Sequence, residues 1–186
     1  MPLADLMLET ERLILRRLRP EDADAIFAVL GDPIAMQYYP RTFDRKDAEE
    51  WIERNLRRYT EYGHGLYAVV LKTSGDVVGD CGLVTQQIDG RPELEVGYHL
   101  RRDQWGHGYA TEAARGCMDY AFRELAAAKV ISLIRQENLP SRRVAERNGM
   151  RVERQVMHFG LMHLMYAACR PSDEERGSGR KLTADS

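Results

Sequence analysis

Residues 105–110, which read Trp-Gly-His-Gly-Tyr-Ala, are the first place where this sequence could do chemistry. The run before them alternates apolar and polar residues, and the run after them has apolar residues at helical spacing. We therefore expect a turn from a strand into a helix. The first N–H groups of a helix have no partners within the helix, and its dipole adds about half a positive charge there. Gly106 and Gly108 lack the Cβ atoms that would keep a phosphate off the backbone, so the segment predicts an anion site.

The common nucleotide-binding motifs do not account for this turn. The sequence has no Gly-x-x-x-x-Gly-Lys-Ser/Thr segment, and no Gly-x-Gly-x-x-Gly segment follows the first strand of a strand–helix–strand unit. A glycine turn between a strand and a helix is also compatible with a purely structural role. The turn alone therefore does not identify its ligand.

Residues on both sides of the turn extend the pattern. The stretches 95–100 (Glu-Val-Gly-Tyr-His-Leu) and 105–113 (Trp-Gly-His-Gly-Tyr-Ala-Thr-Glu-Ala) resemble the acetyl-CoA motif of the GNAT (general-control-related N-acetyltransferase) superfamily. The second stretch is similar to the branch that contains ribosomal-protein N-terminal acetyltransferases, and residues 11–16 resemble that branch's first strand. A further match runs from Asn138-Leu139-Pro140-Ser141 to Asn148-Gly149-Met150, so the resemblance covers roughly residues 9–170.

The resemblance implies that acetyl-CoA binds here as a co-substrate. Backbone N–H groups from Gly106 to Thr111 would bind its pyrophosphate, and the strand around Val96 to Leu100 would pair with its pantetheine arm. Asn138 would contact the arm across a splayed sheet. The residues that the resemblance assigns to the cofactor are Val96, Tyr98, Leu100, Trp105, Gly106, His107, Gly108, Tyr109, Ala110, Thr111, Asn138 and Ser141.

Acetyl transfer to an amine requires a neutral nucleophile, and this requirement suggests a base. A lysine amine is only about 0.04% neutral at pH 7, whereas an α-amine is roughly one-seventh neutral. Glu95 is the candidate base because it lies on the polar side of the strand that would hold the thioester. It could equally be a solvated strand carboxylate. Glu93 is the weaker alternative because it lies farther from the turn.

The departing thiolate needs a proton or a hydrogen bond, and Ser141 is the candidate for this role. It stands three residues after Asn138, which matches that role in the resembling branch. Its alternative role is that of a helix-start serine bonded to its own backbone. The wider superfamily usually has a tyrosine acid where this chain has Ala145, so a tyrosine mechanism is not available from that position. An oxyanion donor would be a backbone N–H near Val96 or Gly97.

Other polar and aromatic residues near the turn could either bind a ligand or have a purely structural role. His99, His107 and Arg101 or Arg102 could meet phosphate charge, and the arginines could equally form a solvated rim. The remaining histidines show no ligand spacing, so no metal is assigned. Four aromatic residues could shape an acceptor pocket or simply fill core, namely Tyr38, Tyr39, Trp51 and Tyr59.

Hydrophobic periodicity indicates the elements that must position these residues. Strands are expected over residues 12–18, 66–72, 77–85, 93–100, 129–135, 151–159 and 161–169. Helices are expected from Pro20 to Leu30, from an N-cap at Asp44 to about Tyr59, and over residues 109–125 and 140–148. Gly79 and Gly82 suggest a bulge or a close backbone approach.

These elements define an α+β fold. The resemblance specifies it further as the acyl-CoA N-acyltransferase fold, a mixed, mostly antiparallel sheet of six to seven strands that is splayed in the middle and flanked by about four helices. We expect residues 1–170 to form a single domain. Residues 171–186 form a polar tail that has too few apolar residues to order itself.

Composition limits the class of protein. The formal net charge of -2 gives no electrostatic case for nucleic-acid binding, and no apolar run approaches the roughly 20 residues of a membrane span. Cys81, Cys117 and Cys169 are odd in number and lack metal-ligand spacing, so we expect reduced, buried thiols and a cytoplasmic protein. A monomer or a homodimer is equally compatible.

The sequence therefore predicts an N-acetyltransferase that moves an acetyl group from acetyl-CoA to a primary amine by direct attack in a ternary complex. The acceptor is a protein N-terminal α-amine or a small-molecule amine such as an antibiotic, a polyamine or an amino acid. Two alternatives keep the same sequence features, namely a catalytically silent CoA-binding regulatory module and a protein-interaction domain. An acyl-CoA hydrolase fits less well, because no Ser/His/Asp or Cys/His arrangement stands out.

Overall fold

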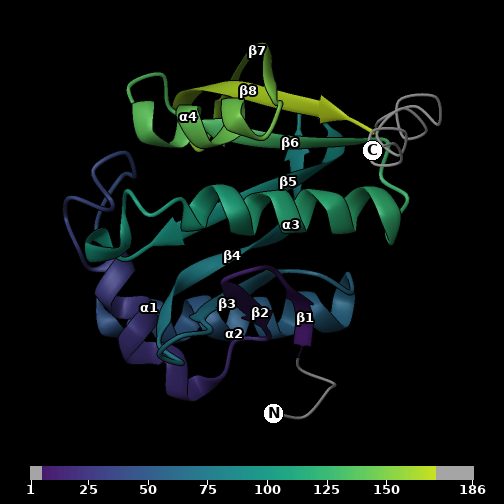
Figure 1. The fold of residues 1–186 in the computed structure, drawn as a ribbon. Coiled ribbons are helices and arrows are strands. Elements are labelled where there is room, and N and C mark those ends of the chain that lie inside the picture. The colour runs from purple at the N-terminus through teal and green to yellow at the C-terminus, as the bar shows by residue number, and fades with distance from the viewer. Residues whose placement is uncertain (1–5, 171–186) are drawn as a thin grey trace, which may run out of the picture.

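The computed structural model describes residues 6–170, so the predicted tail at 171–186 lies outside the described residues. Its helices are α1 (Ala23–Leu30), α2 (Arg45–Glu61), α3 (Tyr109–Arg123) and α4 (Leu139–Arg147), and short 3-10 turns occupy Pro20–Asp22 and Arg102–Gln104. Its strands are β1 (Leu6–Glu9), β2 (Leu13–Arg16), β3 (Leu66–Leu71), β4 (Val77–Ile88), β5 (Arg91–Leu100), β6 (Lys129–Ile134), β7 (Arg151–His158) and β8 (Leu161–Cys169). The strands form one sheet in the order β1-β2-β3-β4-β5-β6-β8-β7 (Figure 1).

The sheet is antiparallel except where β5 meets β6. The pairing of β4 with β5 runs without interruption from Gly79 and Leu100 to Ile88 and Arg91. Strands β5 and β6, in contrast, are paired within the described residues at Glu95 and Ile131. The sheet therefore opens in its middle, toward the carboxyl ends of both strands, and each of these ends leads into a helix.

The helices cover the two faces of the sheet separately. In Figure 1, α3 crosses the front of the sheet while α2 lies behind its first three strands. Helix α3 packs on the larger core through residues that recur at helical spacing, namely Ala113, Ala114, Cys117, Met118, Ala121 and Phe122. Helices α1 and α2 enclose a second cluster that includes Ile26, Leu30, Ala48, Ile52 and Val70.

Local sequence explains where α2 begins. The Asp44 side chain accepts a hydrogen bond from the Asp47 N–H at 2.8 Å, and the Asp47 side chain accepts one from the Asp44 N–H at 2.8 Å. These two bonds satisfy backbone donors that have no partner inside the helix. The predicted N-cap at Asp44 is thus confirmed.

The predicted architecture is confirmed, with two differences. The sheet has eight strands, because β1 pairs with β2 around a turn in which the Thr10 N–H donates to the Leu13 carbonyl at 2.9 Å. β1 is a short edge strand defined by its pairing with β2, which periodicity within the strand does not reveal. The expectation that all three thiols are buried is wrong for Cys169, which is exposed at the last residue of β8, whereas Cys81 and Cys117 are buried.

The predicted glycine bulge in β4 is also present. The register between β3 and β4 shifts at Val69/Val70, opposite Gly79, whose φ is 149°. A Cβ at Gly79 would overlap the carbonyl oxygen of His99, and one at Gly82 would overlap that of Gly65. These two glycines therefore let neighbouring backbones approach β4 more closely than a side chain would allow.

The contacts of Gly82 and its cross-strand partner Gly97 give a matched test of this close approach. We expect Gly82→Ala to lower the free energy of unfolding by about 1–3 kcal/mol, because the neighbouring backbone must move. Gly97→Ala is the control, since the nearest atom to its Cβ would be a Leu66 methyl carbon at 3.6 Å. Urea denaturation of both variants measures the difference, and equal stabilities would refute the close approach.

Candidate active site

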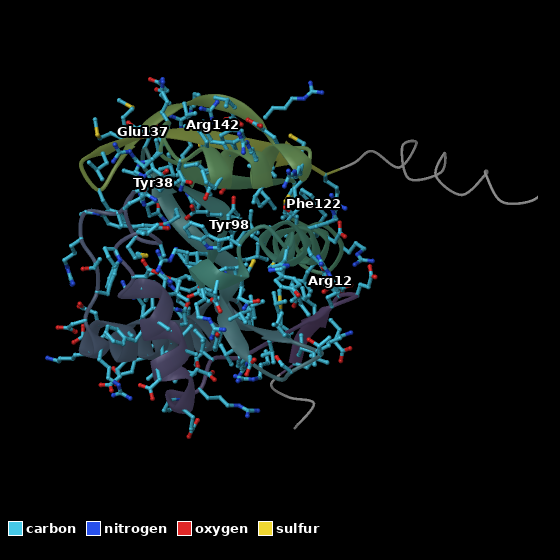
Figure 2. All side chains as sticks on the ribbon, turned by 60° about the vertical axis from the view of Figure 1, so that its left-hand side comes forward. Arg12, Tyr38, Tyr98, Phe122, Glu137 and Arg142 are labelled. Carbon is cyan, nitrogen blue, oxygen red and sulfur yellow. The ribbon has the colours of Figure 1, made fainter. Side chains whose placement is uncertain are left out.

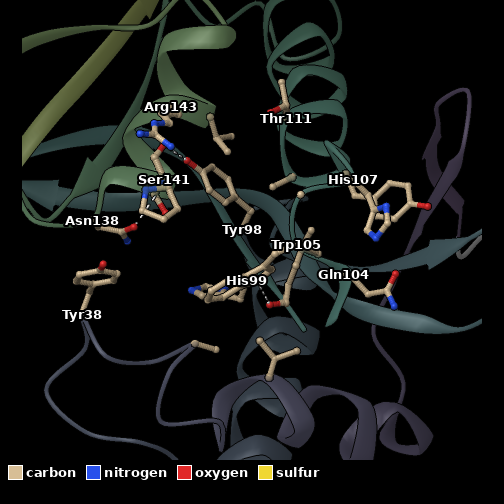
Figure 3. A pocket seen from close by; sticks show the side chains of 18 of the residues that line it. Tyr38, Tyr98, His99, Gln104, Trp105, His107, Thr111, Asn138, Ser141 and Arg143 are labelled. Carbon is tan, nitrogen blue, oxygen red and sulfur yellow. Dashed lines mark hydrogen bonds between the residues drawn. The ribbon is translucent and has the colours of Figure 1, made fainter. Parts of the chain in front are cut away.

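A cavity of about 590 Å³ lies where the sheet opens. Its walls come from the end of β5, the glycine turn, the first residues of α3 and α4, and the loop segment 35–39 (Figure 3). Eleven of the twelve residues assigned to the cofactor from the sequence line it together, namely Tyr98, Leu100, Trp105, Gly106, His107, Gly108, Tyr109, Ala110, Thr111, Asn138 and Ser141. The cavity also lies close to the centre of the molecule, where Tyr98 is labelled in Figure 2.

Two helices begin at this cavity. Helix α3 starts at Tyr109 and α4 at Leu139, and both first turns contribute lining residues. The Asn138 side chain caps α4 by accepting a hydrogen bond from the Ser141 N–H at 3.2 Å. Arg143 and Arg147, which the sequence reading did not single out, line the same cavity. Two helix N-termini and two guanidinium groups together favour a ligand with several negative charges.

The glycine turn has the backbone conformation that only glycine adopts without strain. Gly106 has a φ of 82° and Gly108 a φ of 81°, both in the left-handed region. The Trp105 indole closes the turn by donating to the Leu100 carbonyl at 2.8 Å. The His107 ring stacks on Tyr109, with ring centroids 5.6 Å apart. At its two glycines the turn therefore presents backbone to the cavity, between the side chains of Trp105, His107 and Tyr109.

The N-terminal strands brace this turn. Arg12 donates from Nε to Glu112 at 2.6 Å and from a terminal nitrogen to the His107 carbonyl at 2.9 Å. Its guanidinium also lies over the Tyr109 ring, 4.7 Å from the centroid. Glu112 accepts a further bond from the Thr10 hydroxyl at 2.5 Å. About a hundred residues separate these partners in sequence, which is why spacing analysis does not reveal the brace.

Side-chain hydrogen bonds cross the opening between β5 and β6. The Tyr98 hydroxyl donates to the Ser141 carbonyl at 2.9 Å and so joins β5 to α4. Glu95 accepts from the Leu133 N–H at 3.1 Å and from the Gln86 amide at 2.7 Å. Burial raises the pKa of Glu95, and these hydrogen bonds oppose the rise. The structure places the Glu95 carboxylate at the start of the opening, but not among the residues that line the cavity.

Val96 is the one cofactor candidate whose side chain lies elsewhere. It is fully buried in the core beneath α3 and does not line the cavity. The strand alternation explains this position, because Val96, Tyr98 and Leu100 share the face of β5 that α3 covers. Only the backbone of Val96 is available to the opening.

A second set of polar groups lies on the other wall. His99 bonds through Nδ1 to the Asp80 carboxylate at 2.7 Å and through Nε2 to the Tyr39 hydroxyl at 2.7 Å. The Trp51 indole donates to the other Asp80 oxygen at 2.7 Å. His99, Tyr39 and Trp51 are predicted from the sequence as candidates near the site, but Asp80 is not. The feature that could have indicated Asp80 is a carboxylate between Gly79 and Cys81, inside an apolar strand.

The comparisons with known proteins agree with this geometry. The family described as "Acetyltransferase (GNAT) domain" matches residues 12–151. The chain therefore belongs to the GNAT family of acetyltransferases, and its sheet and helices are the GNAT fold. The Bacillus subtilis protein YkkB is 39% identical over 160 residues, which cover 86% of this chain and 93% of YkkB.

Solved structures support the same family. A GNAT-family acetyltransferase from Bacillus anthracis is 27% identical, with a TM-score of 0.75 over 88% of this chain and 98% of that one. RimL, a ribosomal L7/L12 alpha-N-protein acetyltransferase solved in complex with coenzyme A, has a TM-score of 0.71 over 88% of this chain and 97% of its own. At 17% identity, RimL is similar in fold alone.

Residues 6–170 contain neither a membrane-spanning helix nor a cluster of metal-binding side chains. No helix there is long and apolar enough to cross a membrane. No group of three or more His, Cys, Asp or Glu side chains in that range is placed to hold a metal ion.

The brace around Glu112 predicts a pH-dependent stability. Burial alone would raise the pKa of Glu112, but hydrogen bonds from Thr10 and Arg12 outweigh it and lower the pKa. Because the folded pKa is depressed, the stabilisation is present above the unfolded pKa of about 4.3 and is lost as the pH falls through the folded value. We expect Glu112→Gln to cost about 1–2 kcal/mol at pH 7 and progressively less below pH 4.

Urea denaturation at neutral and acidic pH measures this difference. Asp119→Asn, an exposed carboxylate on the same helix, is the control and should have little effect at either pH. A loss for Glu112→Gln that is equally large at both pH values would show that the charge of Glu112 is not what stabilises the turn.

Proposed function

We propose that the protein is an acetyl-CoA-dependent N-acetyltransferase whose acceptor is a primary amine. The observation that carries the proposal is the single cavity at which the glycine turn, two helix N-termini, Arg143 and Arg147 meet. A pyrophosphate and a ribose phosphate carry the charges that such a site would bind. Membership of the GNAT family and the coenzyme A bound to RimL support the choice of acetyl-CoA over other polyphosphates.

The residues fit each part of this co-substrate. The N–H groups of the turn, from Gly106 to Thr111, would bind the pyrophosphate, because no Cβ stands at either glycine. The open edge of β5 beyond Glu95 would accept the extended pantetheine arm as an added strand. Asn138 lines the opposite side of the cavity and would contact the arm there. Bound in this way, acetyl-CoA supplies the activated acetyl group as a thioester.

Ser141 is our candidate for stabilising the departing thiolate. It lies in the first turn of α4, lines the cavity and is held in place through its own N–H and carbonyl by Asn138 and Tyr98. Both bonds use its backbone, and the Ser141 side chain also interacts with the Tyr98 hydroxyl. A thiol is a good leaving group, so a hydrogen bond can replace a strong acid here.

The acceptor side of the cavity is formed by the loop before α2. Met36, Gln37, Tyr38 and Tyr39 line the cavity opposite the turn and α4. Figure 3 shows Tyr38 facing Asn138 across this space. Mixed aromatic and polar surfaces of this kind suit a small amine or an extended peptide end. The similarity to RimL makes a peptide α-amine one of the acceptors to test.

The decisive experiment combines binding and turnover. Calorimetry with acetyl-CoA tests the site, and a screen of peptide and small-molecule amines that measures free thiol release tests the reaction. We expect binding, and turnover with at least one class of amine. Binding without turnover across the panel would instead support a silent CoA-binding module. Absence of binding at millimolar acetyl-CoA would favour a protein-interaction domain.

The backbone cradle predicts the effect of a side chain at Gly108. We expect Gly108→Val to raise the Kd for acetyl-CoA by at least tenfold, or about 1.4 kcal/mol, because Cβ and its methyls would obstruct the phosphate. Gly75→Val is a matched control, since Gly75 also has a positive φ and open space around it but lies in the β3–β4 turn. Calorimetry on both variants checks this expectation, and equal affinities would contradict the cradle.

Ser141→Ala tests the candidate for the thiolate. We expect kcat to fall by roughly fivefold with little change in the Kd for acetyl-CoA, because a hydrogen bond contributes about 1 kcal/mol. Steady-state kinetics with the best acceptor measures it. An unchanged kcat would assign Ser141 to the helix start alone.

A further inference from the structure

We propose that His99, oriented by Asp80 and reached through the Tyr39 hydroxyl, accepts the proton that the acceptor amine loses. This inference rests on the proposed function and names groups for its proton transfer. It differs from the sequence-based prediction, which gave the role of base to Glu95.

The three groups form one continuous hydrogen-bonded chain. Asp80 Oδ1 and His99 Nδ1 are 2.7 Å apart, and His99 Nε2 and the Tyr39 oxygen are also 2.7 Å apart. Asp80 is only 1% exposed, and its second oxygen accepts from Trp51 at 2.7 Å. Each partner comes from a different element, namely β4, β5, α2 and the loop that precedes α2.

Ring packing holds the imidazole in a single orientation. The Trp51 ring meets His99 edge-on with centroids 5.4 Å apart, and the Tyr39 ring is tilted at 5.5 Å. A carboxylate can only accept, so Nδ1 of His99 carries a proton toward Asp80. In neutral His99, Nε2 is then an acceptor and receives the Tyr39 hydroxyl. Nε2 is thus the basic atom, and it points toward the loop side of the cavity.

The chain reaches the cavity, whereas Glu95 does not. His99 and Tyr39 both line the cavity, together with Trp105 and Tyr98. Tyr39 is 40% exposed as a whole residue and lines the cavity, while its hydroxyl end is enclosed where it meets His99. Glu95 lies on the same face of β5 as His99, four residues earlier in the strand. Its oxygens accept hydrogen bonds from Gln86 and Leu133. Access therefore favours His99 as the acceptor of the proton.

The charges around His99 make it a stronger base than an ordinary buried histidine. Burial opposes a charge on His99, but the Asp80 carboxylate, by its charge and hydrogen bond, and the more distant Glu95 together raise the pKa of His99. Arg58 of α2 interacts with the same two carboxylates and lowers the pKa of Glu95. The pKa of Tyr39 is raised by burial and by Glu95 and Asp80, so its hydroxyl stays protonated and able to donate.

The proton that leaves the amine passes through Tyr39 and His99 to solvent, and each group returns to its starting state. The neutral amine attacks the thioester carbonyl, a C–N bond forms, and the C–S bond breaks. The nitrogen gives one proton to the Tyr39 oxygen while the Tyr39 hydroxyl proton passes to His99 Nε2. The imidazolium opposite Asp80 then returns that proton through Tyr39 to solvent, and the thiolate takes up one proton. The products are an amide and a free thiol, with no further reactant.

The test is the pH dependence of kcat for the full chain with one amine identified by the screen. His99 must be neutral to accept a proton, so kcat of the wild-type enzyme falls as the pH drops through the raised pKa of His99. We call this fall the acidic limb. We expect His99→Gln to lower kcat by on the order of 10²-fold or more and to abolish the acidic limb. Tyr39→Phe should lose less, because a water molecule can replace the hydroxyl. His158→Gln, outside the cavity, is the matched control and should keep the wild-type profile.

Two further variants separate His99 from Glu95. Asp80→Asn removes the main charge that raises the pKa of His99, so the acidic limb should move to lower pH. Glu95→Gln should move the limb in the same direction and lower kcat by less than His99→Gln does. The ionisation of the amine is common to all variants, so any shift between them comes from the protein. If Glu95→Gln abolishes turnover at every pH while His99→Gln keeps the wild-type profile, the proposal is overturned.

NMR of the imidazole nitrogens tests the hydrogen bonds between Asp80, His99 and Tyr39 without turnover. The protein has five histidines, and the signals that His99→Gln removes are those of His99. We expect Nδ1 to be the protonated nitrogen of neutral His99, and Asp80→Asn to lower its pKa in a protein that remains folded. A proton on Nε2, or a pKa that Asp80→Asn leaves unchanged, would overturn the proposal. These outcomes are independent of acetyl-CoA binding, so the failure of either proposal is recognisable by itself.

Discussion

The separation of β5 from β6 is the constraint on which the candidate site depends. Parallel neighbours paired at Glu95 and Ile131 diverge beyond that pair, and both carboxyl ends then turn into helices. Because β5 leads into α3 and β6 into α4, the two helix N-termini come to lie on either side of one opening. A fully paired sheet would bring them together as well, but it would leave no unpaired strand edge between them.

Opening a sheet leaves backbone groups without strand partners, and side chains compensate here. Glu95 satisfies the N–H of Leu133 in β6, and Tyr98 adds a hydrogen bond from β5 to the Ser141 carbonyl in the first turn of α4. Each of these bonds ties an element on one side of the opening to an element on the other. The site is therefore open to a ligand, while these hydrogen bonds fix the distance between the elements on its two sides.

Features encoded in neighbouring residues could be predicted from the sequence, and features that join distant residues could not. The turn at Gly106 to Ala110, the N-cap at Asp44 and the bulge at Gly79 are local, so residue type and spacing indicated them. The Asp80–His99–Tyr39 chain joins positions 19 and 60 residues apart, and only the pairing of β4 with β5 brings the first two together. The burial of Val96 likewise depends on which face α3 covers.

The brace at Arg12 has a consequence for how the site comes into being. The turn at His107 is held by Arg12, which precedes β2, and β2 is itself held by its pairing with β3. The residues that recognise the ligand therefore form a continuous stretch of sequence but not an independent folding unit. A fragment that begins after residue 12 would retain the whole motif and lack the scaffold that shapes it. Binding competence in this sense depends on residues at the start of the chain as well as on the motif itself.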